Sequence, residues 1–531
     1  MTKYYDTRNK HYLKVYLLSI FYLFIVATAF GKKERYVIPN TSYHVRDYGA
    51  LGDGRTVDTK AINATIDAAS NAGGGTVYFS AGTYLSYSIH LKSNIAIYLD
   101  AGAVLLAADS SAGGKYDAAE PNEWGDTYQY QDYGHSHWHN SLIWGENLVN
   151  ISITGTGLIN GKGLNRSASI RRPWGNKAIS LKLCRNVTLK EFTIIYGGHF
   201  GVLATGVDIL TIDNLKMDTN RDGMDIDCCR NVHISNCSIN SPYDDGICLK
   251  SSYALGYNLS TQNVTIANCQ VSGYDLGSFY NGTYQRNEWK KVPDKEGPTG
   301  RIKFGTESNG GFKNIAISNC VFDFCRGLAL ETVDGALLED ITIDNITMRD
   351  VTNSPIFLRL GARMRAPTGT PVGSLRRVAI SNLVAYNADA HFATIIAGLP
   401  GHDIEDIKLT NIKIYYRQMD SAISKIQVAV PEHEKTYPEP NKMGIMPAYG
   451  FFIRHAANIE MNNVEISYMG SETRPAMYIE DVKGLQLRNV KPQPVAGQPL
   501  MVMKDVTDVV IKDSRGLKDK TIKKKDTIKF E

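Results

Sequence analysis

The sequence predicts an all-β protein, built as a single-stranded, right-handed parallel β-helix with an N-terminal capping helix. A short strand-like phrase recurs along most of the chain, long helical patterns are rare, and glycine, asparagine and tyrosine are abundant. The 531 residues are 43% hydrophobic and 21% charged, which is typical of a folded protein. A period in the twenties with one strand per copy indicates a solenoid.

The repeated phrase is Asn-Val-x-Ile-x-Asn. Its clearest copies are NVHISN at 231, NVTIAN at 263 and NIAISN at 314, and the closest copies begin 22 to 26 residues apart. Apolar and polar residues alternate in each copy, as expected of a strand. Leucine-rich repeats share this period but need a leucine scaffold and helices, so the pattern favours a parallel β-helix.

The first 29 residues have the pattern of a secretory signal peptide. Four basic residues precede an apolar run over 15–26, and an Ala-Thr-Ala site ends at residue 29. The run is short for a membrane span, although an N-terminal anchor is the alternative. The same segment contains one acidic residue, Asp6, so its removal lowers the formal net charge from +4 to +1. We therefore expect a periplasmic or extracellular protein that binds neither nucleic acid nor, after cleavage, a membrane.

Residues 36–110 are expected to form the N-terminal cap and the first coils. The stretch TVDTKAINATIDAASNA over 56–72 predicts a helix that covers the open first coil and blocks edge pairing. Its apolar face would contain Ala61, Ile62, Thr65, Ile66 and Ala69.

The β-helix is predicted to continue over 111–515 and to end in a basic C-terminal tail over 516–531. Two insertions, near 270–298 and 417–450, interrupt the repeats. Long loops inside compact repeats usually carry function, so we expect both to form walls of a cleft.

Three of the eight cysteines occupy a core position of the repeat. Cys237, Cys269 and Cys320 each follow the closing asparagine of a copy, where other copies have an aliphatic residue. We expect them to pack as small hydrophobic side chains, while export would allow disulfides as the alternative. No cysteine spacing indicates a zinc site.

Three carboxylates are expected to meet on one face of the β-helix. Asp222 and Asp244 each lie 13 residues after the start of their repeat copies, so they should stack one rung apart, with Asp245 beside them. Like charges this close raise one pKa, which separates a proton donor from a proton acceptor. Clustered oxygens also suit Ca²⁺, so a metal or structural site is the alternative.

Several stretches of the chain resemble one enzyme family. NRDGMDID at 220 and SPYDDGICLKSS at 241 lie one coil apart, and GTESNGGFKNIAISNC follows at 305. Together with RDYGALGDGRTVDT at 46 and GGGTVYFSAGTYL at 73, they resemble the family 28 glycoside hydrolases, the polygalacturonases and rhamnogalacturonan hydrolases, whose fold is the pectin-lyase-like solenoid. The stretches at 46 and 73 also occur in other pectin-acting β-helices, whereas the pair at 220 and 241 is specific.

The resemblance implies inverting hydrolysis of α-galacturonosyl bonds in pectic polysaccharides or oligosaccharides, without metal or other cofactor. We expect the protein to be a monomer. Asp244 corresponds to the family's general acid, and Asp222 and Asp245 correspond to the pair that orients and deprotonates water. The acid and base of an inverting glycosidase lie about 6.5–9.5 Å apart. Asp225 corresponds to a further aspartate that we expect to be structural.

The chain departs from the family at the residues that bind a uronate carboxylate. Thr299 occupies the place of a family histidine, and in RGLALET at 326 the residues Ala329 and Glu331 replace an arginine and a lysine. The string Arg301-Ile302-Lys303 spells the missing motif one coil too early, and we interpret it as incidental.

This loss favours a neutral sugar beyond the cleaved bond. Glu331 in place of lysine would repel an anion there, so a galacturonic acid–rhamnose bond of rhamnogalacturonan is favoured over homogalacturonan. The alternatives are a polygalacturonase acting on homogalacturonan, a Ca²⁺-dependent pectate lyase, and a non-catalytic sugar-binding β-helix.

Further residues are candidates for substrate binding. Lys250 matches the family lysine that follows the acid pair. Arginine is the natural bidentate partner of a carboxylate, so Arg359 or Arg363 could bind a uronate. The alternative for these arginines is a solvated basic turn. The alternative for His199 is a buried or capping role. The candidates are Lys250, His199, Glu307, Glu331, Arg359 and Arg363.

Overall fold

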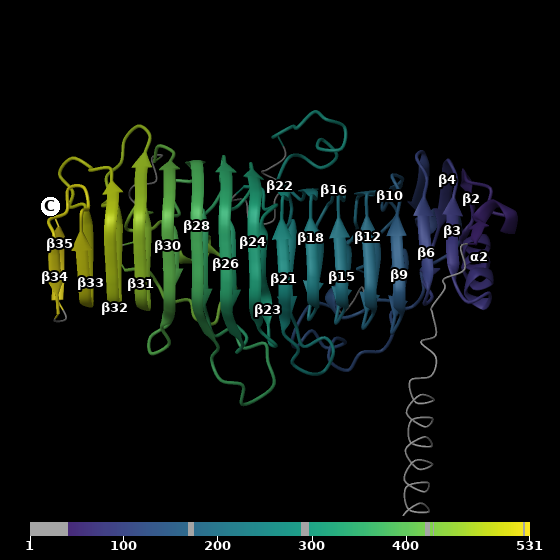
Figure 1. The fold of residues 1–531 in the computed structure, drawn as a ribbon, viewed down its shortest axis with the longest axis horizontal. Coiled ribbons are helices and arrows are strands. Elements are labelled where there is room, and N and C mark those ends of the chain that lie inside the picture. The colour runs from purple at the N-terminus through teal and green to yellow at the C-terminus, as the bar shows by residue number, and fades with distance from the viewer. Residues whose placement is uncertain are drawn as a thin grey trace, which may run out of the picture. The chain divides into compact units, whose positions relative to one another are not determined.

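The computed structural model describes residues 41–167, 175–287, 297–419, 425–427, 429–523 and 526–530. The predicted signal segment, 1–29, lies outside these residues. Within them, a search for helices of membrane-spanning length and apolarity found none. The strands of the described part pair into three ladders. Figure 1 shows the strands of one ladder in a row along the long axis.

The first ladder carries the repeated phrase. Every pairing along it is parallel, and successive strands face each other in register, as in Val232 with Val264 and Ile315. Its strands are β1 (Ser42–His44), β3 (Gly75–Phe79), β6 (Ile95–Leu99), β9 (Val149–Thr154), β12 (Arg185–Lys190), β15 (Asp208–Asp213), β18 (Arg230–Ser235), β21 (Thr261–Ala267), β24 (Phe312–Asp323), β26 (Leu337–Arg349), β28 (Ser374–Ala388), β30 (Ile404–Tyr416), β31 (Phe451–Tyr468), β32 (Met477–Pro492) and β33 (Met501–Lys512).

The second ladder carries the acidic stretches. It is also parallel, and its middle strands are buried along their whole length. Its strands are β5 (Ile89–His90), β8 (Ile143–Glu146), β11 (Ile179–Lys182), β14 (Phe200–Thr205), β17 (Asp222–Asp227), β20 (Ile247–Ser251), β23 (Ile302–Ser308), β25 (Leu328–Thr332), β27 (Ile356–Leu360) and β29 (Thr394–Ala397), which pairs with β31.

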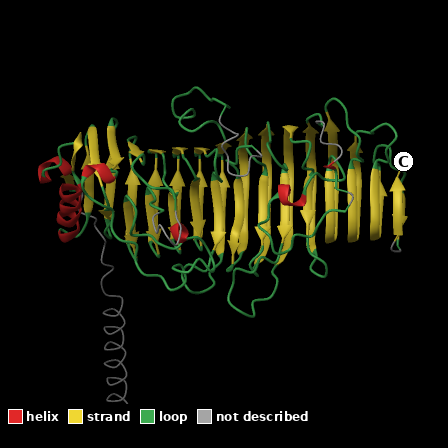
Figure 2. Cartoon of the chain, turned by 180° about the vertical axis from the view of Figure 1, so that it is seen from behind, coloured by secondary structure: helices red, strands yellow, loops and turns green. Residues whose placement is uncertain are grey.

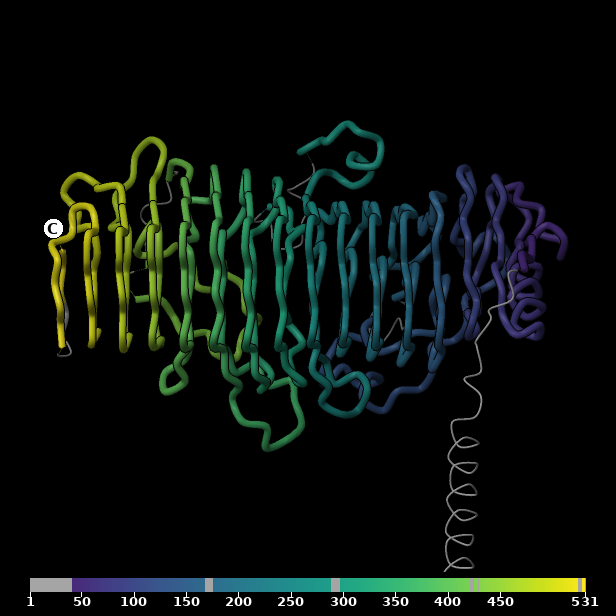
Figure 3. Tube along the Cα trace, viewed as in Figure 1, coloured from purple at the N-terminus to yellow at the C-terminus, as the bar shows by residue number. Residues whose placement is uncertain are grey.

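The third ladder consists of short parallel strands and merges with the first at β24, which pairs with both β21 and β22. Its strands are β2 (Asp53–Val57), β4 (Gly82–Ser86), β7 (Ala103–Ala107), β10 (Leu158–Asn160), β13 (Thr193–Ile195), β16 (Lys216–Asp218), β19 (Ser238–Asn240) and β22 (Gln270–Ser272). One strand per ladder and coil confirms the single-stranded parallel β-helix, and Figure 3 traces the coils in sequence order.

The predicted capping helix is confirmed as α2 (Thr59–Asn71). It buries Ile62, Thr65, Ile66 and Ala69, and Ala61 packs against them while partly exposed. Figure 2 shows this helix and the C-terminus at opposite ends of the stack. The helix covers apolar side chains that the first coil would otherwise expose.

Asparagine closes most copies of the repeat because of its backbone conformation. Asn236, Asn268 and Asn319 have φ of 57°, 57° and 55°, in the left-handed region that asparagine tolerates better than most residues. Their side-chain amides also form a ladder: Asn268 donates to Asn236 over 3.3 Å, and Asn319 donates to Asn268 over 3.2 Å. Each coil therefore turns at the same place and is tied to its neighbour there.

The cysteines pack in the core, as predicted. All eight are free and buried, and the three repeat cysteines belong to the continuous cluster of apolar side chains between the ladders.

The C-terminal end pairs with the last coil. Residues 516–531, expected to be a basic tail, contain β34 (Lys520–Ile522) and β35 (Asp526–Phe530), and both pair antiparallel with β33. Ile522 is buried. This segment therefore covers the edge that the final coil would otherwise leave open.

Candidate active site

Three carboxylates converge at the start of β17 and in the turn before β20, as predicted. Oxygens of Asp222, Asp244 and Asp245 all lie within 4.8 Å of one another. Asp222 and Asp245 are buried, whereas the Asp244 side chain is 33% exposed. Asp244 is thus the most exposed side chain of the triad, and Asp245, although buried, lines a cavity beside it. These closest oxygens are nearer to each other than the about 6.5–9.5 Å expected between the acid and base of an inverting enzyme.

The predicted stacking partner of Asp222 is wrong by one residue. Met224 faces Ile247, an offset that places Asp222 opposite Asp245, and the amide of Gly223 donates to the Asp245 carbonyl. The preceding strands, β16 and β19, pair Lys216 with Ser238, so the turn after β19 holds one residue more than the turn after β16. The extra residue is what allows two adjacent carboxylates in this turn: one stacks and the other reaches outward.

Asp245 is held by two buried cations. Its Oδ1 lies 2.8 Å from Nε of Arg301, and its Oδ2 lies 3.3 Å from Nζ of Lys303. Burial opposes ionisation of Asp245, but these cations outweigh it and lower its pKa to about 2. The interpretation of Arg301-Ile302-Lys303 as incidental is therefore wrong, because both cations point at the triad. Lys303 lies on β23, the next strand of the ladder after β20, and Arg301 directly precedes that strand.

Glu439 and Tyr437, from the insertion at 417–450, complete this cationic group. Arg301 donates to both carboxylate oxygens of Glu439, and Lys303 donates to the hydroxyl of Tyr437 over 2.9 Å. Arg326 also pairs with Glu439, over 3.2 Å. Glu439 immediately precedes the short helix α3 (Pro440–Met443). The insertion thus fixes the partner of Asp245, in addition to forming a wall.

A second set of charges lies on the other side of Asp244. Nε of Arg221 lies 3.3 Å from Oδ2 of Asp244, and its Nη2 lies 3.0 Å from Oδ2 of Asp132. His199 lies against the same arginine, and its Nε2 lies 3.0 Å from Oδ1 of Asp132. Burial and the adjacent Arg221 lower the pKa of His199 to about 4, so this imidazole is neutral at pH 7.

Asp222 differs from Asp245 in protonation. Burial, together with the neighbouring Asp244 and Asp225, raises the pKa of Asp222 well above its usual value. Burial likewise raises the pKa of Asp225 to about 6, although Lys250 opposes the shift. The two buried acids of the triad therefore have opposite character: burial and the neighbouring acids favour the protonated form of Asp222, whereas the two cations favour the ionised form of Asp245.

Asp225 gives a test of these charges. Its raised pKa means that the folded protein must deprotonate a buried carboxyl as pH rises from about 4 to about 6, which costs stability in that window. We expect the free energy of unfolding of Asp225→Asn to rise relative to wild type over this window, by about 2–3 kcal/mol. Denaturant titrations at several pH values measure the difference. A constant difference across the window would contradict the assignment.

Asp244 lies in the wall between two cavities. One, of about 230 Å³, is lined by residues that include Arg166, His199 and Arg221. The other, of about 300 Å³, is lined by residues that include Thr299, Arg301 and Glu439. Tyr243 and Asp244 belong to both linings. A bound chain that filled both cavities would therefore pass directly over the exposed carboxylate.

The remaining predicted residues occupy other places. Lys250 is buried beside the triad, with its Nζ 3.3 Å from Asp225 and 3.2 Å from Glu307. Glu331 is fully buried beneath Lys303, 3.6 Å away, and burial raises its pKa to about 7. None of these three side chains lines either cavity.

Two predicted substrate-binding arginines, Arg359 on β27 and Arg363 just after it, contact other parts of the protein. Arg359 donates to the carbonyls of Gly398 and Glu432, and Arg363 pairs with Asp334. Neither lines the cavities at Asp244.

Sequence reasoning missed several residues of the site. Arg221 directly precedes Asp222 inside a stretch already recognised, so its position was a usable signal. Asp132 and Tyr133 belong to the connection between β7 and β8, where no repeat copy occurs for more than thirty residues and aromatic residues are frequent. The absence of the phrase there indicates a third loop beside those at 270–298 and 417–450. No sequence signal marked Glu439 as a partner of Arg301.

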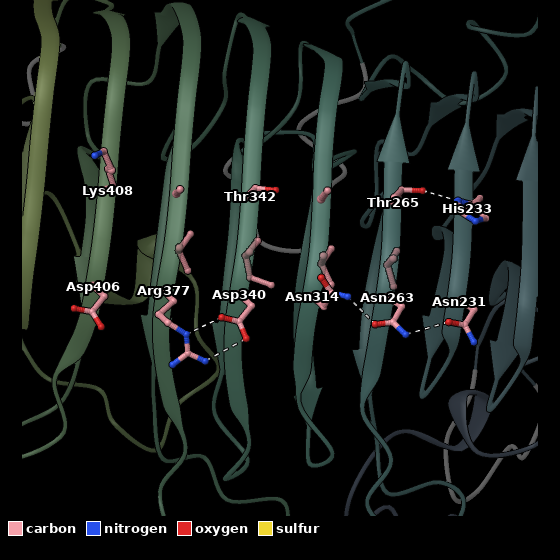
Figure 4. Close-up of a pocket in the computed structure, with 16 residues that line it drawn as sticks. Asn231, His233, Asn263, Thr265, Asn314, Asp340, Thr342, Arg377, Asp406 and Lys408 are labelled. Atoms are coloured by element: carbon pink, nitrogen blue, oxygen red, sulfur yellow. Dashed lines mark hydrogen bonds and ion pairs between the residues drawn. The ribbon is translucent and has the colours of Figure 1, made fainter.

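A further groove, of about 780 Å³, lies on the outer face of the first ladder, and the triad does not line it. Figure 4 shows its side chains on successive strands, with small or short residues between His233 and Lys408. Asn231, Asn263 and Asn314 at its edge bond to one another, and Arg377 bonds to Asp340. These polar groups satisfy each other along the sheet.

Comparisons with known proteins agree with the fold. Residues 42–275 match the family model described as rhamnogalacturonase A/epimerase, pectate lyase-like. The chain is 27% identical over 323 residues to a probable polygalacturonase of Vitis vinifera, covering 55% of this chain and 61% of the relative. It is also 27% identical over 323 residues to an exo-poly-alpha-D-galacturonosidase of Dickeya chrysanthemi, covering 58% of this chain and 50% of the relative. The matches thus span only about half to three fifths of these relatives.

A solved structure of a family 28 exopolygalacturonase from Yersinia enterocolitica superposes with a TM-score of 0.59 at 19% identity, covering 84% of this chain and 78% of that chain. This likeness extends the fold agreement beyond the segment that the family model matches. The comparisons agree with the resemblance to the family 28 glycoside hydrolases: residues 42–275 match the rhamnogalacturonase A/epimerase, pectate lyase-like model, one relative is named a probable polygalacturonase, and the fold is that of a family 28 exopolygalacturonase.

Proposed function

We propose that the protein is a glycoside hydrolase that cleaves α-galacturonosyl bonds in pectic polysaccharides. The observation that carries this proposal is the placement of Asp244, partly exposed between two cavities, beside the buried carboxyl groups of Asp222 and Asp245. The printed functions of the relatives, polygalacturonase and exo-poly-alpha-D-galacturonosidase, support the same class of reaction.

The proposed reaction is a single displacement. Asp244 donates a proton to the leaving glycosidic oxygen as the bond from that oxygen to the anomeric carbon breaks. A water oxygen bonds to the anomeric carbon, and the water proton passes to Asp245, which is ionised. Asp222 orients the water by hydrogen bonding. Asp245 then releases its proton to solvent and Asp244 takes one up, which restores both groups.

The resemblance implies inversion of the anomeric configuration. The short spacing of the closest carboxylate oxygens makes this a useful test, because retaining enzymes have carboxyl groups only about 5–5.5 Å apart. Proton NMR of the first product formed should show the β-anomer. Initial release of the α-anomer would overturn the single-displacement reaction.

We further propose that the cleaved bond joins galacturonic acid to rhamnose. In the 300 Å³ cavity, the buried cations Arg301 and Arg326 already have carboxylate partners, so a neutral sugar fits there without competing for them. This reasoning replaces direct repulsion by Glu331, which lies beneath Lys303 and outside the cavity lining. Homogalacturonan is the second candidate, because Lys442, an exposed cation, also lines this cavity and both relatives named above act on galacturonan.

Product analysis on purified rhamnogalacturonan and homogalacturonan oligosaccharides tests the proposal. We expect faster release of reducing ends from rhamnogalacturonan, no ultraviolet-absorbing unsaturated product, and no loss of activity with a chelator. Faster hydrolysis of homogalacturonan would favour the second candidate. Unsaturated, chelator-sensitive products would instead indicate a lyase, and no product from any pectic substrate would favour a sugar-binding protein.

We also propose that the protein is exported and acts as a monomer. The N-terminal pattern supports export, and the expected mature chain begins at Phe30. Amino-terminal sequencing of the protein from the medium or periplasm measures the cleavage point, and light scattering measures the mass in solution.

A further inference from the structure

We propose that a third cavity binds the uncleaved part of the substrate chain, and that Arg166 binds a uronate carboxylate there. This inference rests on the proposed function and specifies its ligand: an acidic oligosaccharide that extends from Asp244 toward the N-terminal coils. The cavity has a volume of about 850 Å³, within the range of small-molecule sites. It lies between the connection that follows β7 and the segment around Asn165.

The third cavity is continuous with the candidate active site. Arg166 lines both the 850 Å³ cavity and the 230 Å³ cavity that contains Asp244. Tyr133 lines the larger cavity, and its chain neighbour Asp132 lines the smaller one. Because Tyr243 and Asp244 also line the 300 Å³ cavity, the three spaces form one series. A polymer chain can therefore occupy all three, with the reacting bond at Asp244.

Arg166 is the cation best placed to bind an incoming anion. It is exposed, its Nη1 donates to the carbonyl of Asn220 over 2.8 Å, and its guanidinium lies 5.4 Å from the centroid of the Tyr243 ring. Within the described ranges it has no ion-pair partner, whereas Arg221 is paired with Asp132 and Asp244. The contacts of Arg166 with the Asn220 carbonyl and the Tyr243 ring orient its guanidinium at the junction of the cavities, and they leave N–H donors for a carboxylate.

The walls of the third cavity suit a sugar. Tyr87 and Tyr116 pack edge to face with centroids 5.3 Å apart, and their hydroxyls donate to the carbonyls of Asp109 and Ala108, both over 2.8 Å. Fixed aromatic rings beside polar groups are typical of ligand sites. Lys115 lines the same cavity, is exposed, and has no ion-pair partner among the residues that the structure describes. The cavity thus offers a second cation for an acidic chain.

Binding measurements separate this inference from catalysis. In the Asp244→Asn background, isothermal titration calorimetry would use a tetrasaccharide of alternating galacturonic acid and rhamnose, and the same tetrasaccharide as its methyl ester. We expect Arg166→Ala to raise the Kd of the acid about 10-fold, as for loss of a charge-assisted hydrogen bond, and to leave the Kd of the ester unchanged. Arg166→Lys should keep part of the affinity. Arg185→Ala, an exposed arginine of β12, is the matched control and should change neither Kd.

The outcomes are distinguishable. An unchanged Kd for the acid in Arg166→Ala, an equal loss for acid and ester, or no binding of the tetrasaccharide at all would overturn the inference. If the acid-specific loss occurs but wild type cleaves no pectic substrate, the binding site stands and the proposed hydrolysis fails. If wild type cleaves but Arg166→Ala binds normally, the hydrolysis stands and this site fails.

Discussion

Asp244→Asn is expected to lower kcat by about 10³-fold, because it removes the only proton donor of the proposed reaction, and such donors contribute about 10²–10⁴-fold. The fold should be unchanged. Asparagine has nearly the same shape, and the Asp244 side chain is 33% exposed, so no buried cation loses its sole partner. Arg221 keeps its ion pair with Asp132, in which Nη2 and Oδ2 lie 3.0 Å apart. Reducing-end assays on rhamnogalacturonan oligosaccharides, with circular dichroism for folding, measure both expectations.

Asp508→Asn is the matched control for this substitution. Asp508 is exposed at the far end of the β-helix and has φ of 53°, a conformation that asparagine also adopts readily. The Asp508→Asn substitution should leave kcat unchanged. A loss below tenfold in Asp244→Asn would show that another group donates the proton.

Arg301→Ala is expected to lower the free energy of unfolding by about 3–5 kcal/mol, because it removes the buried cation that two buried carboxylates share and leaves each of them with a single cationic partner. Arg301 is 1% exposed and contacts both Asp245 and Glu439. Lys303 and Arg326 remain, but each neutralises only one of the two acids. Urea titration at pH 7 measures the loss, and a change below about 1 kcal/mol would contradict the role of Arg301.

The pH dependence provides an independent check on Arg301. The pKa of Asp245 is lowered to about 2, so its contribution to stability is fully present above the unfolded pKa near 4 and is lost as pH falls toward 2. In Arg301→Ala this acid-side loss should shrink. Arg185→Ala, whose guanidinium lies on the exposed face of β12, should retain the wild-type pH profile.

The fold was predictable because the repeat constrains every coil in the same way. The alternation of the phrase identifies the buried face, and the closing asparagine identifies the left-handed bend, so local sequence was sufficient. The convergence of Asp222 with the acid pair followed from the period alone. The prediction that Asp222 stacks on Asp244 was wrong by one residue. The error arose in the turn after β19, which is one residue longer than the turn before it in the stack, so the period no longer determines the register.

The partners of the acids were less predictable, because they depend on contacts between distant segments. Arg301 and Lys303 spell a known motif in an unexpected coil, and only the ladder register shows that β23 lies next to the triad. Glu439 comes from an insertion with no repeat, 138 residues away from Arg301. Conversely, Arg359 and Arg363 have the right chemistry for a uronate, but tertiary packing directs them to carbonyls and to Asp334.

The contact between Arg301 and Glu439 joins a segment that is synthesised early to one that is synthesised later. A nascent chain that has emerged as far as β29 already contains all three acids and the cations Arg301 and Lys303, and each coil can stack on the one before it. It does not yet contain Glu439. The local environment of the acids is therefore finished late, after the scaffold that holds them has been made.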